Sequence, residues 1–171
     1  PAGVLTACAI HAGMPDGMKR VVKPMIELMA ALPSVVIGFI GMIILAPWLQ
    51  NTFGLATGLN LTNASIMLAF MCVPTIASIS EDALRNVPGG IREASLALGA
   101  TRWETLVRVE LRWAMSGIAT AVMLGISRVI GETMVVLMVA GGAAIIPESI
   151  FDPVRPMTSS IAAEMAEAAV G

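Results

Sequence analysis

One uncharged stretch is too long for any single element of a soluble domain. Between Leu28 and Ser80 no residue is Asp, Glu, Lys, Arg or His, a run of 53 residues. A helix needs about 20 apolar residues to cross a bilayer, so this run has room for two membrane spans joined by a short turn. Of all residues 57% are hydrophobic and only 13% are charged, against roughly 25% charged in a soluble domain. The sequence therefore predicts an all-α, polytopic transmembrane helical bundle.

Apolar segments alternate with more polar ones along the chain. We expect four segments in the membrane, at residues 1–13, 24–49, 61–80 and 113–142. Between and after them lie a polar turn at 14–23, an uncharged turn at 50–60, a charged loop at 81–112 and a mixed segment at 143–171 that is extramembrane or re-entrant. The first segment is too short to span alone, so we expect both chain ends to be cuts within a longer protein. Residues 1–171 are treated as one domain.

The basic residues predict the orientation of these segments. Of the ten Lys and Arg residues, five lie in the 81–112 loop and three lie in the 14–23 turn. The opposite side has none in 50–60 and only Arg155 in 143–171. Because short loops rich in Lys and Arg stay in the cytoplasm, the 14–23 and 81–112 segments are predicted to be cytoplasmic.

The 81–112 loop contains signals for regular structure. A Pro-Gly-Gly breaker at 88–90 precedes a short amphipathic helix at 91–98, and Gly99 is suited to a left-handed cap. Thr101 and Glu104 have the spacing of a capping box that begins the next helix. An apolar face on a short cytoplasmic helix suits docking in a groove of a partner protein. Packing of the loop on its own membrane domain is the alternative.

The last predicted span carries two charges, Arg128 and Glu132. Four residues apart on a helix, they would be neighbours able to pair, and the small residues Gly117, Ala121 and Gly125 lie on the same predicted face. The pair therefore faces helices or a polar cavity. It is either part of a solute pathway or a salt bridge that only fixes packing. An arginine in a pathway suits an oxyanion such as phosphate, because its planar fork matches two oxygens.

Other residues are given narrower interpretations. Pro33 and Ser34 either open a helix and expose backbone groups to a pore or form a packing kink. The two cysteines, Cys8 and Cys72, and the single histidine, His11, favour neither a disulfide framework nor a metal site. No basic stripe indicates nucleic acid, and the absence of a Walker loop means that we expect no ATP site in this chain.

Three motifs resemble those of a known family. The run Glu93-Ala94-Ser95, followed by Gly99 and Ala100, resembles the Glu-Ala-Ala motif of ABC importer permeases, although Arg112 stands where that motif usually has Pro. The run 127–134, Ser-Arg-Val-Ile-Gly-Glu-Thr-Met, resembles the Arg-x-x-Gly-Glu-Thr segment of phosphate permeases, and Met134 resembles their C-type subunit. The run 33–36, Pro-Ser-Val-Val, is similar to an earlier segment of the same proteins.

This resemblance implies a function and a set of partners. It implies a non-catalytic, multi-pass permease subunit in a bacterial inner membrane, which translocates inorganic phosphate or, alternatively, another oxyanion such as sulfate or molybdate, or a small solute. An intramembrane enzyme and a channel are weaker alternatives. The implied partners are membrane lipid, an ATP-binding subunit that holds ATP and Mg²⁺, a second homologous permease subunit and a periplasmic phosphate-binding protein.

The resemblance also assigns roles to residues. The implied ATPase-coupling residues are Glu93, Ala94, Ser95, Gly99 and Ala100. The implied substrate-pathway residues are Arg128, Glu132, Ser127, Thr133, Pro33 and Ser34.

Overall fold

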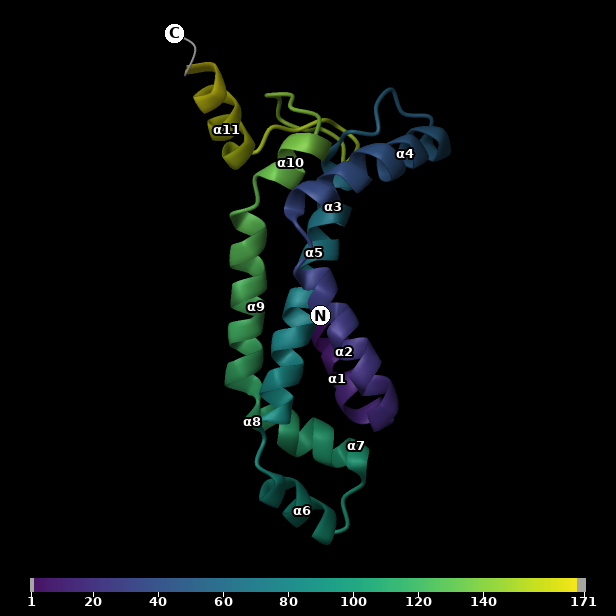
Figure 1. Cartoon of the computed structure of the whole chain (residues 1–171), viewed down its shortest axis with the longest axis vertical. Coiled ribbons are helices and arrows are strands. Elements are labelled where there is room, and N and C mark those ends of the chain that lie inside the picture. The colour runs from purple at the N-terminus through teal and green to yellow at the C-terminus, as the bar shows by residue number, and fades with distance from the viewer. Residues whose placement is uncertain (1, 169–171) are drawn as a thin grey trace. The chain divides into compact units, whose positions relative to one another are not determined.

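The computed structural model describes residues 2–168, which fold into helices joined by turns and loops (Figure 1). Within these residues the only β pairing is an isolated bridge between Gly141 and Val154. The all-α prediction is thus confirmed. The helices form two compact units: a first unit of Pro1–Ala31 and Cys72–Ser127, and a second unit of Leu32–Met71 and Arg128–Gly171. The assignment of residues 1–171 to a single domain stays a prediction.

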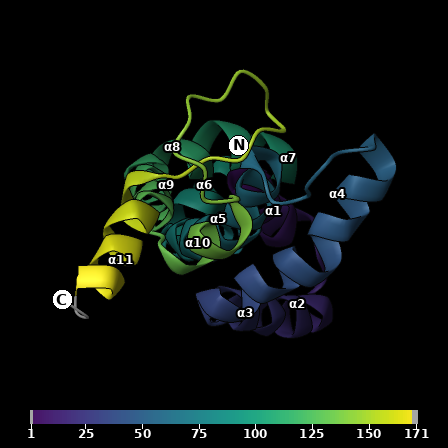
Figure 2. The ribbon, with the colours of Figure 1, turned by 90° about the horizontal axis from the view of Figure 1, so that it is seen from above.

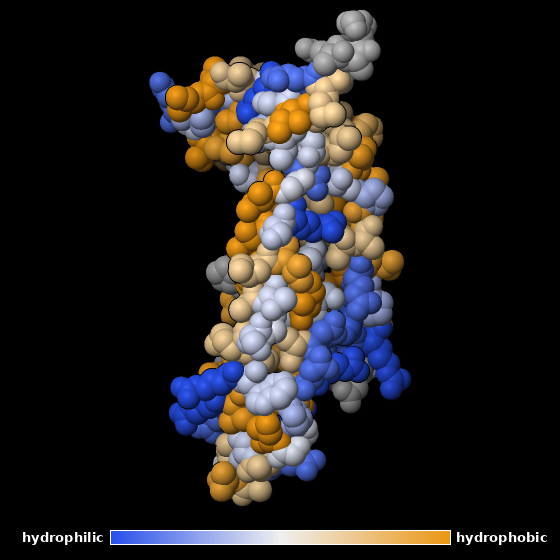
Figure 3. All heavy atoms as spheres, turned by 90° about the vertical axis from the view of Figure 1, so that its left-hand side faces the viewer, coloured by the Kyte–Doolittle hydropathy of each residue, from blue (hydrophilic) through white to orange (hydrophobic). Residues whose placement is uncertain are grey.

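Two helical stretches are long and apolar enough to cross a membrane by themselves. Among the described residues these are Ser34–Phe53, of 20 residues, and Leu61–Arg85, of 25 residues. A third candidate is a pair of helices, Arg102–Trp113 and Met115–Ile130, bent by 69° at the break between them. Large hydrophobic side chains are exposed over much of the chain, and Figure 3 shows many hydrophobic residues, in orange, on one face. A polytopic membrane protein is expected to show such a surface, because lipid or further helices cover it.

The first unit begins with two helices, α1 (Ala2–Gly13) and α2 (Asp16–Ala30). The prediction of a polar turn at 14–23 was wrong, since α2 starts directly after Pro15. Polarity was mistaken for irregular structure there, because Lys, Arg and Met are good helix formers. The helix ends three residues before Pro33, as expected when a proline disfavours helical backbone in the preceding residue.

The rest of the first unit carries the end of α5 (Leu61–Arg85), the loop helices and most of α9 (Met115–Ile130). The loop helices are α6 (Gly89–Ala97), α7 (Arg102–Thr105), the π-helical turn η2 (Leu106–Glu110) and α8 (Leu111–Trp113). Residues of α1, α5, η2 and α9, with two from the turns at 87 and 114, form its buried apolar cluster, which contains Ala7, Leu84, Val87, Leu106, Ala114 and Ile118.

Small residues on α9 allow close packing against α5. A Cβ atom placed on Gly117 would lie 2.6 Å from the Cβ of Ala83, and one on Gly125 would lie 2.5 Å from Ile76. Ala121, between these glycines, is fully buried. The predicted small-residue face of this helix is therefore confirmed as a helix–helix contact.

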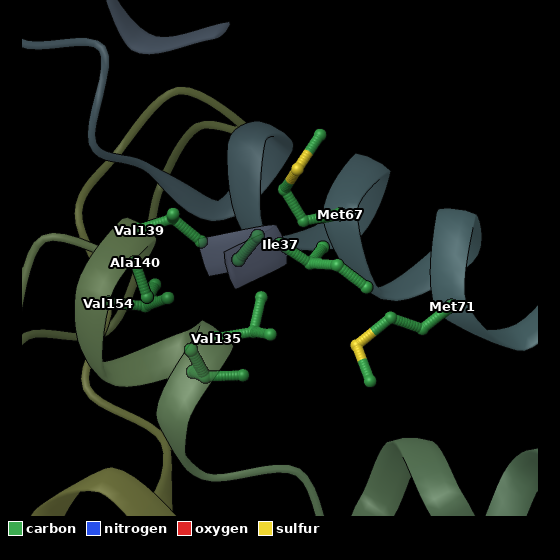
Figure 4. Packing of buried hydrophobic residues seen from close by; sticks show 9 residues of the cluster. Ile37, Met67, Met71, Val135, Val139, Ala140 and Val154 are labelled. Carbon is green, nitrogen blue, oxygen red and sulfur yellow. The ribbon is translucent and has the colours of Figure 1, made fainter. Parts of the chain in front are cut away.

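The second unit contains a helical rod made of α3 (Ser34–Ile40), the π-helical turn η1 (Gly41–Leu45) and α4 (Ala46–Phe53), which Figure 2 shows as one continuous path. The predicted break near Pro33 is confirmed, but it ends one helix and begins another, so the predicted span at 24–49 was wrong. The rod packs on α10 (Met134–Val139) and on the start of α5. Figure 4 shows Ile37, Met67 and Val135 meeting in this core.

The fourth predicted span, 113–142, was wrong as a continuous helix. A bend at Ala114 separates α8 from α9, and α9 ends at Ile130. Glycine favours helix poorly, and after Gly131 the side chain of Glu132 accepts a hydrogen bond from the Val135 N–H (3.3 Å) at the start of α10. The segment after α10 runs irregularly to α11 (Met157–Ala168).

Candidate functional site

Helix α6 presents most of its surface outward. None of its residues is buried, and Glu93 and Ala94 are exposed. Leu98, which follows the helix, has 89% of its surface exposed. Gly99 has a φ of +86°, so the predicted left-handed cap is confirmed. The residues of the predicted apolar face do not all lie on one side. Ala94 and Leu98 are exposed, whereas Ile91 and Ser95 are half-buried.

Two side-chain contacts hold α6 to the segment that follows it. Arg92 Nε donates to Glu110 Oε1 over 2.6 Å, and the hydroxyls of Ser95 and Thr105 lie 3.0 Å apart. Glu110 is only 4% exposed, and Thr105 is also buried. A buried carboxylate needs a cationic partner to offset its loss of hydration. Arg92 supplies that partner, so the inner side of α6 is tied to η2 while its outer side stays open.

His11 takes part in the same cluster. Its Nε2 lies 2.7 Å from Arg92 Nη2 and 3.0 Å from Glu110 Oε2, so α1, α6 and η2 meet at three side chains. The sequence did not predict this cluster, because His11 was considered only as a possible metal ligand. The only hint of the cluster in the sequence was a pair of oppositely charged residues, Arg92 and Glu110, in the 81–112 loop. The helices of that loop need contacts with one another to stay together.

The predicted capping box is present at the start of α7. The N–H of Glu104 donates to Thr101 Oγ1 (3.2 Å), and the N–H of Thr101 donates to Glu104 Oε2 (2.9 Å). The backbone N–H and the hydroxyl of Thr101 hold the pKa of the Glu104 carboxyl below its usual value, because both donors favour its charged form. The box fixes where the chain turns from Gly99 into α7.

A second ionic contact joins α2 to α5. Lys23 Nζ donates to Glu81 Oε2 and to Asp82 Oδ1, each over 2.6 Å. Burial, the largest single influence, lowers the pKa of Lys23, but the Asp82 and Glu81 carboxylates together raise it above its usual value. Lys23 therefore stays charged and links the middle of α2 to the C-terminal end of α5.

The predicted pathway residues gather where α9 gives way to α10. Ser127 and Arg128 are exposed on the last turn of α9. Glu132 and Thr133 are half-buried in the following turn, and the backbone oxygen of Glu132 accepts a hydrogen bond from the Thr158 hydroxyl (3.0 Å). Since Glu132 lies beyond the end of α9 at Ile130, the predicted i,i+4 relationship with Arg128 on one helix was wrong.

Pro33 and Ser34 come near the same turn through the packing of α3 on α10. A Cβ atom on Gly38 would lie 3.2 Å from the Val135 Cα, and one on Gly41 would lie 2.9 Å from a Val139 methyl. Contacts that advance together along both helices mean that α3 and α10 run in the same direction. Their starting ends therefore lie on the same side of the second unit.

An asparagine supports the neighbouring π-helical turn. Asn63 is fully buried, and its Nδ2 donates to the carbonyl oxygens of Gly41 (3.1 Å) and Gly58 (2.9 Å). Gly58 lies so close to the rod that an added Cβ would clash with the carbonyl of Ala46. The rod that starts at Ser34 is thus held at its middle by backbone contacts.

One known protein family matches nearly the whole chain. The profile of the family described as "Binding-protein-dependent transport system inner membrane component" matches residues 1–166.

Individual relatives are also similar over most of the chain. A probable ABC transporter permease protein, YqgH of Bacillus subtilis (strain 168), is 40% identical over 171 residues, which cover 100% of this chain and 55% of that protein. The phosphate transport system permease proteins PstC of Pasteurella multocida and Mesorhizobium japonicum are 34% and 33% identical, over 90% and 98% of this chain and 54% and 57% of their own lengths. The chain thus spans about half the length of the curated relatives it matches.

Proposed function

Because the chain belongs to the family of binding-protein-dependent transport system inner membrane components, we propose that it forms part of the permease subunit of an ABC importer for inorganic phosphate. The observation that carries the proposal is the geometry of α6. It is a helix with no buried residue, tied on one side to η2 and open on the other. A partner that binds the open side would move the ion-paired segment with it.

We propose that this partner is the ATP-binding subunit, which supplies ATP, Mg²⁺ and hydrolysis. The exposed positions Glu93, Ala94 and Leu98 fit a docking surface, with Gly99 and Ala100 forming the turn behind it. A cysteine at Leu98 is expected to crosslink to an ATP-binding subunit in the assembled transporter. A cysteine at Ser95, which faces Thr105, is the matched control and should react far less.

Phosphate is proposed as the substrate on two grounds. The chain is 34% and 33% identical to two proteins named phosphate transport system permease protein, and an arginine, Arg128, stands on the last turn of α9 beside the break before α10. A guanidinium binds an oxyanion through paired hydrogen bonds. In this proposal Arg128 and Ser127 contact the anion. Glu132 moderates the positive charge so that binding stays transient, and Thr133, Pro33 and Ser34 line the same path.

Uptake of labelled phosphate by the full-length transporter tests this proposal. Arg128→Ala should reduce uptake at least tenfold, since a charge-assisted hydrogen bond contributes about 1.5–3 kcal/mol. The matched control is Arg155→Ala, which lies in the segment 143–171 on the side opposite the predicted cytoplasmic loops. This variant should transport phosphate normally. Normal uptake by Arg128→Ala, at normal expression, would make Arg128 structural only.

A second candidate is a permease of the same kind for another oxyanion or solute. The probable ABC permease of B. subtilis, at 40% identity, has no substrate in its name. Competition between phosphate, sulfate and molybdate for uptake separates the candidates. The proposed complex further contains a second permease subunit and a periplasmic phosphate-binding protein.

A further inference from the structure

The first unit contains a basic cavity that neither the proposed pathway nor the proposed docking surface uses. It has a volume of about 590 Å³, and residues of α1, α2, α5 and α6 line it (Figure 1). Ligand pockets in proteins measure about 300–1,000 Å³, so this cavity has room for a ligand. Its charged lining residues are Lys19, Arg20, Lys23, Glu27, Glu81, Arg85 and Arg92.

Two of the cations in this cavity are neutralised by contacts within the protein. Lys23 Nζ lies 2.6 Å from a carboxylate oxygen of Glu81 and 2.6 Å from one of Asp82. Arg92 Nε lies 2.6 Å from Glu110 Oε1. These pairs hold the wall of the cavity together, and they leave the other charged groups of the lining to act on a ligand.

Three cations and one carboxylate of the lining remain. Arg20 and Arg85 are exposed, and neither forms an ion pair with a side chain in the described part of the chain. Lys19 Nζ donates to the carbonyl oxygen of His11 (2.8 Å), which uses one of its three hydrogens. Glu27 is exposed and also has no ionic partner among the described residues. The cavity therefore keeps an excess of positive charge, and it suits an anion with oxygen acceptors.

The ion pair between Lys23 and Glu81 places the cavity at the predicted boundary of the membrane. Glu81 is the first charged residue after the long uncharged run, so it marks the predicted change from membrane span to cytoplasmic loop. Arg85 lies one turn further along α5, on the cytoplasmic side of that boundary. A smaller hollow on the span side of Glu81 is lined by Ile26 and Ala77. The polar head groups of lipids lie at this level, just outside the hydrocarbon.

The other side of α2 is apolar and exposed. Its exposed large hydrophobic residues are Met18, Val21, Met25 and Leu28. They are separated by three or four residues, so they form one stripe along the helix. An exposed apolar stripe on a helix whose opposite side is basic is typical of helices that lie at a membrane surface. The stripe therefore favours acyl chains as the neighbours of α2, with their head groups at the level of the cavity.

We propose that this cavity binds the head group of an anionic phospholipid on the cytoplasmic side of the membrane. The two unesterified oxygens of the phosphodiester accept hydrogen bonds from the guanidinium groups of Arg20 and Arg85, and Lys19 adds positive charge. Basic pockets between membrane helices on the cytoplasmic side are typical sites for such head groups. The bound lipid joins α2 to α5 beside the Lys23 ion pair. None of the proposed pathway residues lines the cavity, so the site does not depend on which solute is transported.

Native mass spectrometry of the full-length permease in its intact complex tests the site. The complex is titrated with phosphatidylglycerol and with phosphatidylcholine, which share the phosphodiester but differ in net charge. Phosphatidylglycerol should be retained at least about tenfold more tightly, because the cavity carries more cations than carboxylates. This preference should shrink as the salt concentration rises, since salt screens charges that water can reach.

Four variants give the expected pattern. Arg20→Gln and Arg85→Gln should each weaken phosphatidylglycerol binding about fivefold, because each loses a charge beside the phosphate. Arg108→Gln is the matched control, since it removes the same charge from a side chain that is 78% exposed and outside this cavity. It should bind within about twofold of the parent. Glu27→Gln should bind more tightly than the parent, because it removes a carboxylate that repels the phosphate. Misfolding cannot produce such a gain.

Three outcomes would overturn the proposal. Equal retention of phosphatidylcholine and phosphatidylglycerol would show that the cavity does not recognise an anionic head group. Equal losses in Arg20→Gln and Arg108→Gln would show a general attraction of lipid to a basic surface. Displacement of phosphatidylglycerol by inorganic phosphate, but not by chloride at the same ionic strength, would make the occupant a free oxyanion instead of a lipid.

Discussion

Both compact units pack helices closely at glycines, and the first unit adds links between charged side chains. In the first unit, charged side chains link one helix to another, as Arg92 and Glu110 join α6 to η2 and Lys23 joins α2 to α5. In the second unit, backbone atoms approach each other directly at Gly38 in α3 and at Gly58 in the segment between α4 and α5. Close backbone packing tolerates almost no displacement, whereas an ion pair keeps much of its energy over a longer distance.

This difference fits the proposed roles of the units. A segment that transmits motion from a partner has to stay connected while it shifts, and ionic contacts allow that. A segment that lines a solute path has to hold its groups in place, and glycine contacts with a buried amide do so. If the comparison is right, the second unit should be the less tolerant of small substitutions, and the first unit should depend on charge more than on volume.

The largest effect is expected for Gly58→Ala in the second unit. The new methyl group would overlap the backbone carbonyl of Ala46, and backbone cannot move aside as a flexible side chain does. We expect a loss of more than about 4 kcal/mol, measured as loss of the monodisperse permease peak in detergent and of its thermal transition. Gly17→Ala, with no atom within 4 Å of the added Cβ, is the matched control. Equal stability of the two variants would contradict close packing at Gly58.

The next largest effect is expected for Glu110→Leu in the first unit. The change leaves Arg92 and His11 without their carboxylate, and because Arg92 is partly exposed we expect a loss of about 2–3 kcal/mol, less than for a fully buried pair. Thermal unfolding of the purified permease measures it.

A double variant separates charge from volume at this position. Arg92→Leu together with Glu110→Leu should lose less stability than the two single changes added together, since no charge is left unpaired. If the stability losses of the two single variants simply add up in the double variant, the ionic link between α6 and η2 contributes nothing to stability.

The sequence predicted the loop better than it predicted the spans. Local signals such as Gly99 and the Thr101–Glu104 box act within a few residues, and both are present. The small-residue face of α9 was also predicted, because a three- to four-residue spacing is enough to reveal it. Apolar length located α5, but it could not show that α9 ends at Ile130, since residues 113–142 are apolar on both sides of Gly131.

The candidate site was harder to predict where it depends on distant contacts. Nothing local to His11 indicates that it meets Arg92 and Glu110, which lie 81 and 99 residues away in the sequence. Asn63 has no predicted role in the sequence, yet it supports the turn at Gly41. Both are polar groups whose partners are fixed by packing, and hydrophobic periodicity carries no information about such pairs.

A moderate effect is expected for Asn63→Leu in the second unit. The carbonyl oxygen of Gly58 loses its donor, and that of Gly41 loses one of two, so we expect a loss of about 2 kcal/mol. Thermal unfolding of the permease measures this, with Asn51→Leu on the exposed end of α4 as the matched control. If Asn63→Leu unfolds at the wild-type temperature, packing alone supports the π-helical turn and the proposed difference between the units is weakened.

The smallest effect is expected for Thr101→Val in the first unit, because it removes a cap and leaves the ion pairs intact. The Glu104 N–H loses its acceptor. A cap contributes about 1 kcal/mol, so amide hydrogen exchange in the first turn of α7 should rise about fivefold. Thr120→Val, whose hydroxyl bonds its own helix at Ser116, is the matched control and should leave α7 unchanged.

The capping box also predicts the sign of a pH effect. The pKa of Glu104 is lower in the folded chain than in the unfolded chain, so its stabilisation is present above the unfolded value of about 4.5. It is lost as the pH falls through the lowered folded value. The protection factors of the α7 amides, which correct for the slower intrinsic exchange at low pH, should therefore fall on acidification in the parent. This fall should be smaller in Thr101→Val, which lacks the hydroxyl that helps to lower the pKa of Glu104. If both proteins respond equally to pH, Glu104 stabilises α7 without its contact to the Thr101 hydroxyl. The capping box would then not be what fixes the start of α7.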